Sequence, residues 1–255
     1  MEKNQEREFG EERIEGRNPI QEVLNSDRSI NCILVAQGER HGAIKDILTL
    51  AREKGVVVKE VHKSKLDELS ETGHHQGIIA LVSPYKYVEV DDILQLAAKK
   101  NETPLVALAD GIEDPQNLGT LIRTLEVAGV HGLLIPKRRA ASVTPAVVKI
   151  SAGAAEHLPI ARVTNISETI KYLKTMGLWI IGTDMDAPAY YYNTDMTGPV
   201  GVVVGSEGRG ISRLVKENCD LLVKIPIRGR ISSLNAAAAC SIVVFDILRQ
   251  RSKKG

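Results

Sequence analysis

The chain has 255 residues, and its 33 Lys and Arg against 32 Asp and Glu give a formal net charge of +1. A chain of this length can bury a substantial core in one large domain or two modest ones. The charge balance does not by itself indicate a nucleic-acid-binding protein, although local basic patches act whatever the total. Aromatic residues make up 4% of the chain, so we do not expect exposed aromatic rings to be its main means of binding.

The cysteines and the N-terminal segment indicate a cytoplasmic protein. Cys32, Cys219 and Cys240 are odd in number and form no C-x-x-C pair, which predicts neither a zinc site nor a disulfide framework. The opening "MEKNQEREFGEER" lacks the apolar core of a signal peptide, and no apolar run reaches the length of a membrane span. We therefore expect reduced thiols, no metal and no membrane partner.

The first third of the chain predicts a small α/β domain. Residues 1–12 are charged and aperiodic and predict a flexible tail. In the helix expected first, Asn18 is predicted as N-cap and Pro19 as the first helical residue. Residues 84–92, "PYKYVEVDD", break the pattern and predict a linker. The expected elements are helices at 18–26, 43–55 and 63–71 and strands at 31–37, 56–61 and 77–83.

The rest of the chain predicts a second α/β domain, residues 93–255. Its strands read as near-continuous apolar runs separated by helices, which is typical of a mostly parallel sheet covered on both faces. The expected strands are 104–110, 132–136, 158–163, 178–184, 200–205 and 221–227. The expected helices are 92–101, 117–128, 145–155, 167–176, 210–218 and 233–250.

Ligands of open parallel sheets bind beyond the carboxyl ends of the strands, and three such ends carry unusual sequences. The first is "ADGIEDPQNLGTLIRTLEVAG", residues 109–129. Arg123 falls off the apolar stripe of its helix and is expected over the turn that contains Gly119. A glycine there costs roughly 1 kcal/mol of helix stability, which suggests that it leaves a surface open for something to reach the arginine. The alternative is a solvated arginine beside a tolerated glycine.

The second strand end is "VGVVVGSEGRGIS", residues 200–212. Its G-x-x-G-x-G spacing is neither the dinucleotide fingerprint nor a P-loop, and Ser206 does not stand in a G-x-S-x-G nucleophile elbow. The glycines would let a ligand approach the backbone closely, and Glu207 could orient a polar group there. The alternative is a simple strand-to-helix turn.

The third strand end is "IPIRGRISSLNAAAAC", residues 225–240. Arg228 and Arg230 form a cationic loop, and either Ser232 or Ser233 is expected to cap the last helix. Asn235 carries both a donor and an acceptor, and the alanines that follow allow a ligand, backbone or partner helix to come close. A capped alanine-rich helix docked on the sheet is the alternative, but it does not explain the paired arginines.

Taken in order, N-L-G-x-x-x-R, G-S-E-G-x-G and I-P-x-x-G-x-x-S-L-N resemble the three signature motifs of the SpoU (TrmH-type) SPOUT RNA 2'-O-ribose methyltransferases. The resemblance extends over residues 13–251. "EGRNPIQEVL" and "HHQGIIALVSPY" are similar to the segments that open and close that family's small L30e-like RNA-recognition domain, here residues 13–83. Residues 128–165 resemble the RlmB-type subgroup, which methylates a guanosine ribose in large-subunit ribosomal RNA.

The resemblance implies a C-terminal SPOUT domain with a trefoil knot that holds S-adenosylmethionine without a metal, and a homodimer formed through that domain. It implies that Arg123 activates the ribose 2'-hydroxyl. The residues implied to contact the cofactor through their backbones are Gly205, Ile225 and Leu234, and those implied to support catalysis are Asn117, Glu207, Ser233 and Asn235. Ile227, Ala237 and Leu125 depart from the usual residues of the family, without removing a catalytic polar group.

RNA contacts are expected from local basic clusters that the net charge hides. The expected contacts are Lys137, Arg138, Arg139, Arg209, Arg228 and Arg230, with His75 and Gln76 in the small domain. Each of these residues has an ordinary solvated surface position as its alternative. Three other functions stay open: a tRNA ribose methyltransferase, a non-catalytic RNA-binding or ribosome-assembly module, and a dinucleotide enzyme, the last disfavoured because G-x-G-x-x-G is absent.

Overall fold

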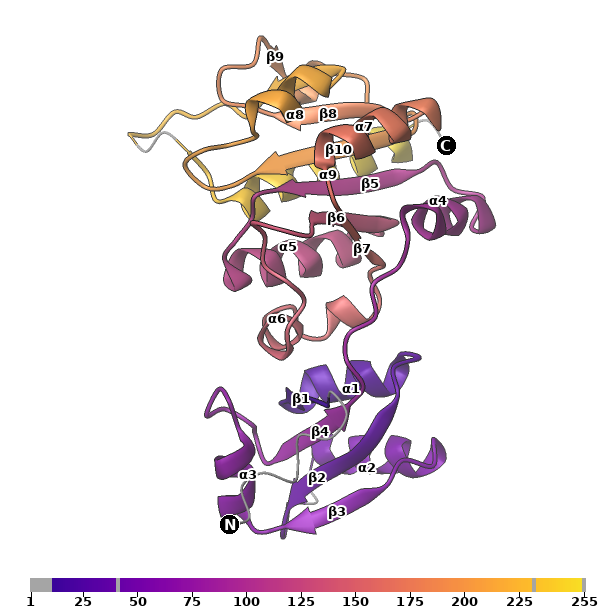
Figure 1. Ribbon diagram of the computed structural model, residues 1–255, viewed down its shortest axis with the longest axis vertical. Helices are drawn as coiled ribbons and strands as arrows, with labels where there is room; N and C mark the ends of the chain where they lie inside the picture. The colour runs from indigo at the N-terminus through magenta and orange to yellow at the C-terminus, as the bar shows by residue number, and fades with distance from the viewer. Residues whose placement is uncertain (1–10, 40–41, 231–232, 254–255) are drawn as a thin grey trace. The chain divides into compact units, whose positions relative to one another are not determined.

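A computed structural model describes residues 11–39, 42–230 and 233–253 of the chain. By their contacts, the residues fall into two compact units (Figure 1). Unit 1 comprises Met1–Lys86 together with Val143–His157, and unit 2 comprises Tyr87–Ser142 together with Leu158–Gly255. The chain therefore passes from one unit to the other three times.

Unit 1 contains a four-stranded mixed sheet in the order β1-β4-β2-β3. Strand β4 pairs antiparallel with both β1 and β2, while β2 and β3 run parallel. β1 was missed by sequence reasoning, because Ile14 is the one apolar side chain in a strand of otherwise charged residues. The strands are β1 (Glu12–Glu15), β2 (Ile30–Ala36), β3 (Val58–Val61) and β4 (Ile78–Val82).

The helices of unit 1 confirm the expected alternation of helix and strand. They are α1 (Arg17–Asn25), α2 (Ala43–Glu53), α3 (Lys63–Leu69) and α6 (Pro145–Ile150), followed by the 3₁₀ turn η1 (Ala154–Glu156). The predicted cap of α1 is wrong: Gly16 is the N-cap, with a φ of 95°, and Arg17 is the first helical residue. The side-chain oxygen of Gln76 accepts a hydrogen bond from the Arg17 amide at 2.9 Å, so a tertiary contact fixes where the helix begins.

The β1 carboxylate of Glu15 is only 3% exposed and is held by a polar cluster within unit 1. It accepts hydrogen bonds from the Glu71 amide at 2.6 Å, from Ser70 at 3.0 Å and from the Thr72 hydroxyl. Lys149 of α6 lies 3.5 Å from the same carboxylate. Burial opposes ionisation, but these bonds and the lysine outweigh it, so the pKa of Glu15 lies below its ordinary value.

A second buried ionic cluster joins the segment 143–157 to the first strands of unit 1. The Arg28 guanidinium contacts Glu156 at 2.7 Å and also pairs with Glu12, and the Arg28 and Glu156 side chains are 6% and 3% exposed. Burial raises the pKa of Glu156 above its ordinary value despite the nearby arginine. Removing one partner of such a cluster would leave an uncompensated charge inside the unit.

Unit 2 contains a seven-stranded sheet in the order β7-β6-β5-β10-β8-β11-β9, and every neighbouring pair is parallel. The strands are β5 (Leu105–Asp110), β6 (Gly132–Pro136), β7 (Ile160–Val163), β8 (Trp179–Thr183), β9 (Ala189–Tyr190), β10 (Val200–Gly205) and β11 (Leu221–Lys224). The expected parallel sheet is confirmed. The short edge strand β9 and the 3₁₀ turn η2 (Tyr191–Asn193) were missed.

Helices cover both faces of this sheet (Figure 1). One face packs against α4 (Val90–Lys99), α7 (Ile166–Thr175) and α8 (Arg213–Asn218) through an apolar core. On the other face α5 (Pro115–Val127) packs against α9 (Ala236–Ser252), which also contacts β10. In the described part of the chain, no helix combines the length and apolarity needed to cross a membrane.

Candidate active site

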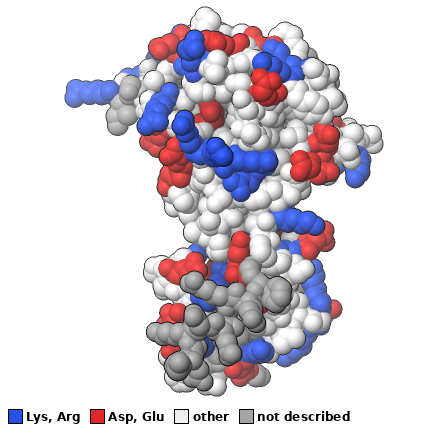
Figure 2. Space-filling model, in the orientation of Figure 1, with Lys and Arg blue, Asp and Glu red and all other residues white. Residues whose placement is uncertain are grey.

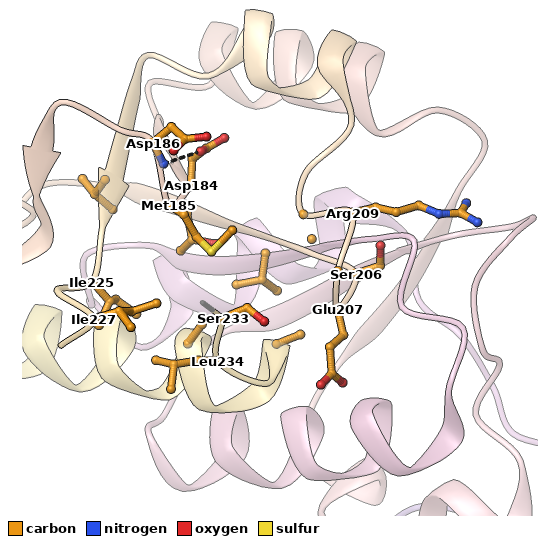
Figure 3. Close-up of a pocket in the computed structure, with 18 of the residues that line it drawn as sticks. Asp184, Met185, Asp186, Ser206, Glu207, Arg209, Ile225, Ile227, Ser233 and Leu234 are labelled. Carbon is orange, nitrogen blue, oxygen red and sulfur yellow. Dashed lines mark hydrogen bonds between the residues drawn. The ribbon is translucent and has the colours of Figure 1, made fainter. Parts of the chain in front are cut away.

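A cavity of about 290 Å³ opens at the carboxyl ends of β8, β10 and β11 in unit 2 (Figure 3). Parallel strands deliver their following loops to one edge of the sheet, which is why segments distant in sequence meet here. The three residues predicted to hold a cofactor, Gly205, Ile225 and Leu234, all line the cavity. Ile227 and Leu234 are 39% and 40% exposed, so the cavity offers apolar surface to a ligand.

Gly205 ends β10 where two stretches of backbone come into contact. A Cβ atom built on Gly205 would lie 2.0 Å from the carbonyl carbon of Gly210 and 2.2 Å from the Ile211 nitrogen. No side chain fits at that separation, because the obstacle is backbone. The turn is closed by a hydrogen bond of 2.9 Å from the Gly210 amide to the Ser206 carbonyl. Gly205 therefore permits the tight turn that forms one wall of the cavity.

A chain of side-chain hydrogen bonds joins the three predicted polar residues at this edge. The Asn235 amide donates to the Asn117 side-chain oxygen. The side-chain amide of Asn117 in turn donates a hydrogen bond to a carboxylate oxygen of Glu207 at 3.4 Å. Figure 3 shows the Glu207 side chain leaving the turn after β10 toward the helix below it. The structure thus brings one residue from each of the three unusual strand ends into a single network.

Two members of that network, Asn235 and Asn117, lie at the starts of helices. Asn235 is the N-cap of α9, and its side-chain oxygen accepts from the amides of Ala237 at 2.9 Å and Ala238 at 3.4 Å. Asp114 is the N-cap of α5, and its side chain accepts a hydrogen bond from the backbone N–H of Asn117 at 2.9 Å. The expectation that Ser233 caps the last helix is wrong, because the helix begins three residues later; Ser232 lies outside the described residues. Ser233 instead lines the cavity.

Arg123 lies two turns along α5 with its side chain exposed. Within the described chain its guanidinium forms no hydrogen bond or ion pair, so all its donors are available to a ligand. The expectation that Gly119 leaves an open surface beside it is wrong, because Gly119 is buried. The glycine belongs to the packed side of α5 rather than to a path toward the arginine.

Sequence reasoning missed a fourth segment of the cavity wall, the polar turn after β8. Asp184 forms an ion pair with Lys216, and its other carboxylate oxygen accepts from the Asp186 amide at 2.9 Å. Burial opposes ionisation of Asp184, but these bonds outweigh it and hold its pKa below the ordinary value. The signal was present, since "DMD", residues 184–186, follows a buried strand, and ligands are expected beyond the carboxyl end of this strand as of the others.

The basic residues predicted to contact RNA are all exposed: Lys137, Arg138, Arg139, Arg209, Arg228 and Arg230. Arg209 lines the cavity, yet Figure 3 shows its guanidinium directed away from the other labelled side chains. On the face of unit 2 seen in Figure 2, Lys and Arg side chains gather in a group flanked by carboxylates. A near-neutral chain therefore still presents concentrated positive charge.

In unit 1 the two predicted RNA contacts differ from each other. His75 is 5% exposed, its Nε2 lies 2.9 Å from an Asp67 oxygen, and its Nδ1 accepts from the Gly77 amide at 3.0 Å. Both ring nitrogens are thus occupied inside the unit, and His75 acts as a structural residue of this loop. Gln76 is exposed with a φ of 55°, and its side chain caps the start of α1. Among the described residues no group of three His, Cys, Asp or Glu side chains is arranged to hold a metal ion.

The parallel sheet, the glycine-walled cavity and the Asn-Asn-Glu network all lie in a part of the chain that matches a known family. Residues 104–245 match the sequence model of the SpoU rRNA Methylase family, and residues 13–88 match that for RNA 2'-O ribose methyltransferase substrate binding. The chain belongs to the SpoU family and is an RNA methyltransferase.

Individual relatives agree with that assignment. The chain is 42% identical over 240 residues to YacO of Bacillus subtilis, named as a TrmH family tRNA/rRNA methyltransferase, covering 94% of this chain and 96% of the relative. The SpoU methyltransferase AviRb of Streptomyces viridochromogenes, crystallised with AdoMet, superposes with a TM-score of 0.79 at 26% identity over 96% of this chain and 92% of its own. A TrmH/SpoU tRNA-modifying enzyme of A. aeolicus has a TM-score of 0.56 at 26% identity and covers 65% of this chain and 85% of its own.

Proposed function

We propose that the protein transfers a methyl group from S-adenosylmethionine to the 2'-oxygen of a guanosine ribose in large-subunit ribosomal RNA. The observation that carries the proposal is the network of Asn235, Asn117 and Glu207 beside a cavity with a glycine wall. In this proposal residues 13–83 recognise RNA together with the segment 143–157 of the same unit, residues 84–92 link, and the rest of residues 93–255 catalyses methyl transfer.

The residues around the cavity fit the proposed cofactor. Backbone approaches at Gly205, where no Cβ can be placed, and the apolar side chains of Ile225 and Leu234 suit a flat, largely apolar purine nucleoside. Asp184 and Lys216 supply charges of both signs at the same wall, which suits a ligand carrying both an ammonium and a carboxylate. When bound, S-adenosylmethionine supplies an electrophilic methyl group on a sulfonium.

Arg123 is the residue we assign to the reacting ribose. Its exposed, unpaired guanidinium can bind the phosphate next to the target nucleotide with a bidentate fork and lower the pKa of the 2'-hydroxyl. An arginine remains protonated at working pH, so the proton leaves through a neighbouring group or water. Asn117, Glu207, Ser233 and Asn235 position the polar groups around the ribose.

Ribosomal RNA is favoured over transfer RNA because of unit 1. The A. aeolicus tRNA-modifying enzyme matches 65% of this chain, whereas the substrate-binding model matches residues 13–88 in addition to the methylase model. Lys137, Arg138, Arg139, Arg209, Arg228, Arg230 and Gln76 are the proposed RNA contacts, because each is exposed. His75 supports them by fixing the loop that presents Gln76.

The proposal includes a homodimer, a knot and a cytoplasmic location. Val127 of α5 is 67% exposed and Phe245 of α9 is 46% exposed, and these two helices pack together, which suits an interface between two copies of unit 2. Cys32, Cys219 and Cys240 are all free thiols, as expected in a reducing compartment. Sedimentation of the full chain tests the dimer, and an experimental trace of α9 relative to the loop 205–210 tests the knot.

Mapping 2'-O-methyl groups in RNA from cells with and without the gene tests the substrate. A guanosine of large-subunit RNA that loses its methyl group supports the proposal, whereas loss from tRNA selects the alternative substrate. Calorimetry separates the other functions: S-adenosylmethionine affinity is expected, absence of cofactor affinity would indicate a non-catalytic RNA-binding module, and NAD affinity would overturn the assignment.

A further inference from the structure

Three of the six tyrosines of the chain are consecutive, and the structure gathers their rings on the surface of unit 2. Tyr190 and Tyr192 are stacked, with ring centroids 5.3 Å apart and an interplanar angle of 7°, and Tyr191 meets Tyr192 edge-on at 5.1 Å. Tyr190 and Tyr192 are 37% and 45% exposed. Stacked and edge-to-face arrangements of this kind are favourable for aromatic pairs, so the three rings support one another at the surface.

The strand next to this tyrosine cluster (Tyr190, Tyr191 and Tyr192) adds a positive charge. β11 pairs with the edge strand β9 so that Lys224 stands opposite Tyr190, and the Lys224 ammonium lies 5.0 Å from the centre of the Tyr190 ring. In the described part of the chain, neither Lys224 nor the arginines at 228 and 230 form an ion pair with a carboxylate. The cluster therefore lies beside one cation, Lys224, whose charge no carboxylate of the described residues neutralises.

The cluster also adjoins the cavity along the chain on two sides. Lys224 directly precedes Ile225, and Tyr190 follows Asp186 by four residues; both Ile225 and Asp186 line the cavity. None of the three tyrosines lines the cavity, so their occupant is not the ligand inside it. Whatever binds the cluster therefore binds outside the cavity, on segments that continue directly into its walls.

Exposed planar rings next to an unpaired cation match the chemistry of single-stranded nucleic acid. Bases stack on aromatic faces, while Lys and Arg neutralise the phosphates between them. Protein interfaces are also rich in tyrosine, but the ammonium of Lys224 beside the rings, which pairs with no carboxylate of the described residues, favours a polyanion as the occupant. We propose that the tyrosine cluster and Lys224 stack an unpaired nucleobase of the RNA that flanks the methylated nucleotide. This inference rests on the proposed RNA substrate and adds a base-stacking site to it.

Binding of two oligonucleotides tests the proposal without requiring catalysis. The probes are an oligoadenylate of about 12 nucleotides, within the usual site size, and an abasic oligonucleotide of the same length, which keeps the phosphates and lacks the bases. Replacing Tyr192→Leu is expected to raise the Kd for oligoadenylate about tenfold and to leave the Kd for the abasic strand unchanged. Tyr192→Phe keeps the ring and is expected to bind as the wild type does.

Two further variants make the test specific. Tyr172→Leu is a matched control, because Tyr172 is 38% exposed on α7 and belongs to no ring cluster of the described residues. Lys224→Met is expected to reduce the slope of log Kd against log salt by about 0.7, the value for one phosphate contact on a single strand, whereas Tyr192→Leu leaves that slope unchanged.

Several results would overturn the stacking site. They are wild-type affinity of Tyr192→Leu for oligoadenylate, equal weakening on both oligonucleotides, or no preference of the wild type for the strand with bases. A change in sedimentation of Tyr192→Leu with unchanged RNA affinity would mean that the cluster contacts another protein chain instead. Methyl transfer by the wild type to ribosomal RNA is measured separately, so failure of the stacking site is distinguishable from failure of the proposed function.

Discussion

Asn235 donates a hydrogen bond through its side-chain amide to Asn117, which lies 118 positions earlier in the chain. The same Asn235 side chain caps α9 with its oxygen, so one residue joins two tasks: it fixes where a helix begins and holds a polar group of the site in place. Asn117 in turn donates a hydrogen bond from its side chain to Glu207. These two tasks can be separated by substitution.

Asn235→Asp is expected to preserve the cap and damage catalysis. Aspartate is as good an N-cap as asparagine, so the melting temperature should stay near that of the wild type. The side-chain amide of Asn117 would then lie between the carboxylates of Glu207 and of the new aspartate, and its NH₂ group could donate to only one of them. We therefore expect methyl transfer to fall about 10²-fold, because the polar groups would be misplaced. Thermal denaturation and single-turnover kinetics measure the two effects.

A matched control for that variant is Asn165→Asp. Asn165 is the N-cap of α7, and its side chain accepts hydrogen bonds from the backbone N–H groups of Ser167 and Glu168. It bonds no residue of the Asn-Asn-Glu network. Its methyl transfer should be unchanged. If Asn235→Asp keeps the wild-type rate, the network does not position the catalytic groups.

Arg123→Lys keeps the positive charge and loses the planar fork. We expect kcat to fall about 10²-fold, since a bidentate contact at the reacting centre is replaced by a single mobile donor, while affinity for S-adenosylmethionine is unchanged. Arg213→Lys is the control, because Arg213 is 82% exposed and pairs only with Glu217 among the described residues. Wild-type turnover by Arg123→Lys would show that the fork has no role.

Gly205→Ala is expected to open the turn and weaken cofactor binding. The added methyl group would lie 2.0 Å from backbone, so the loop must move, with a loss of stability of roughly 1–3 kcal/mol. Calorimetry with S-adenosylmethionine should show at least a tenfold rise in Kd. Gly198→Ala, where a Cβ would meet nothing within 4 Å, should leave both stability and affinity near the wild type.

The Glu15 cluster predicts acid sensitivity of unit 1. Its pKa is lower in the folded state than in the unfolded chain, so its stabilising contribution is complete above the unfolded pKa and is lost as pH falls through the folded pKa. Glu15→Gln should lower the free energy of unfolding at neutral pH by about 1–3 kcal/mol and flatten its decline at acid pH. Urea titrations at neutral and acid pH measure both; an unchanged decline would assign the acid sensitivity to other carboxylates.

Burial predicts that the cysteine thiols are unreactive in the folded protein. Burial raises the pKa of both Cys219 and Cys240 to about 12. At pH 8 almost no thiolate is present at either site, so iodoacetamide should leave both unmodified in the native protein and label all three cysteines in denaturant. Mass spectrometry of the labelled peptides provides the measurement. Rapid native labelling of Cys240 would show that α9 opens frequently.

Much of the site could be predicted from the sequence, because ligands of parallel sheets bind beyond the carboxyl ends of the strands. Parallel strands bring their carboxyl ends together, so Asn117, Glu207 and Asn235 were expected at one edge despite their separation. The same rule applied to the end of β8 would have found Asp184, although not its partner Lys216 on α8. That segment lacks the glycines that drew attention to the others, and its lysine partner comes from a different helix.

What the sequence did not predict depends on tertiary partners. Ser233 and Asn235 are both good caps, and the structure selects Asn235, whose side chain also bonds Asn117 from a distant part of the chain. His75 looked like a surface residue until Asp67 and the Gly77 amide were seen to occupy its ring nitrogens. The tyrosine cluster depends on the register of β9 against β11, which a two-residue strand does not reveal.

The membership of residues 143–157 in unit 1 has a consequence for modularity. The buried Arg28 and Glu15 find their partners Glu156 and Lys149 in that distant segment, so a fragment ending near residue 86 would carry unmatched charges in its interior. Unit 1 is not formed by one continuous segment, so it cannot be expressed alone or exchanged as a single stretch of sequence. A chimaera between relatives must transplant both segments together, and the two stretches of sequence are expected to have evolved as one.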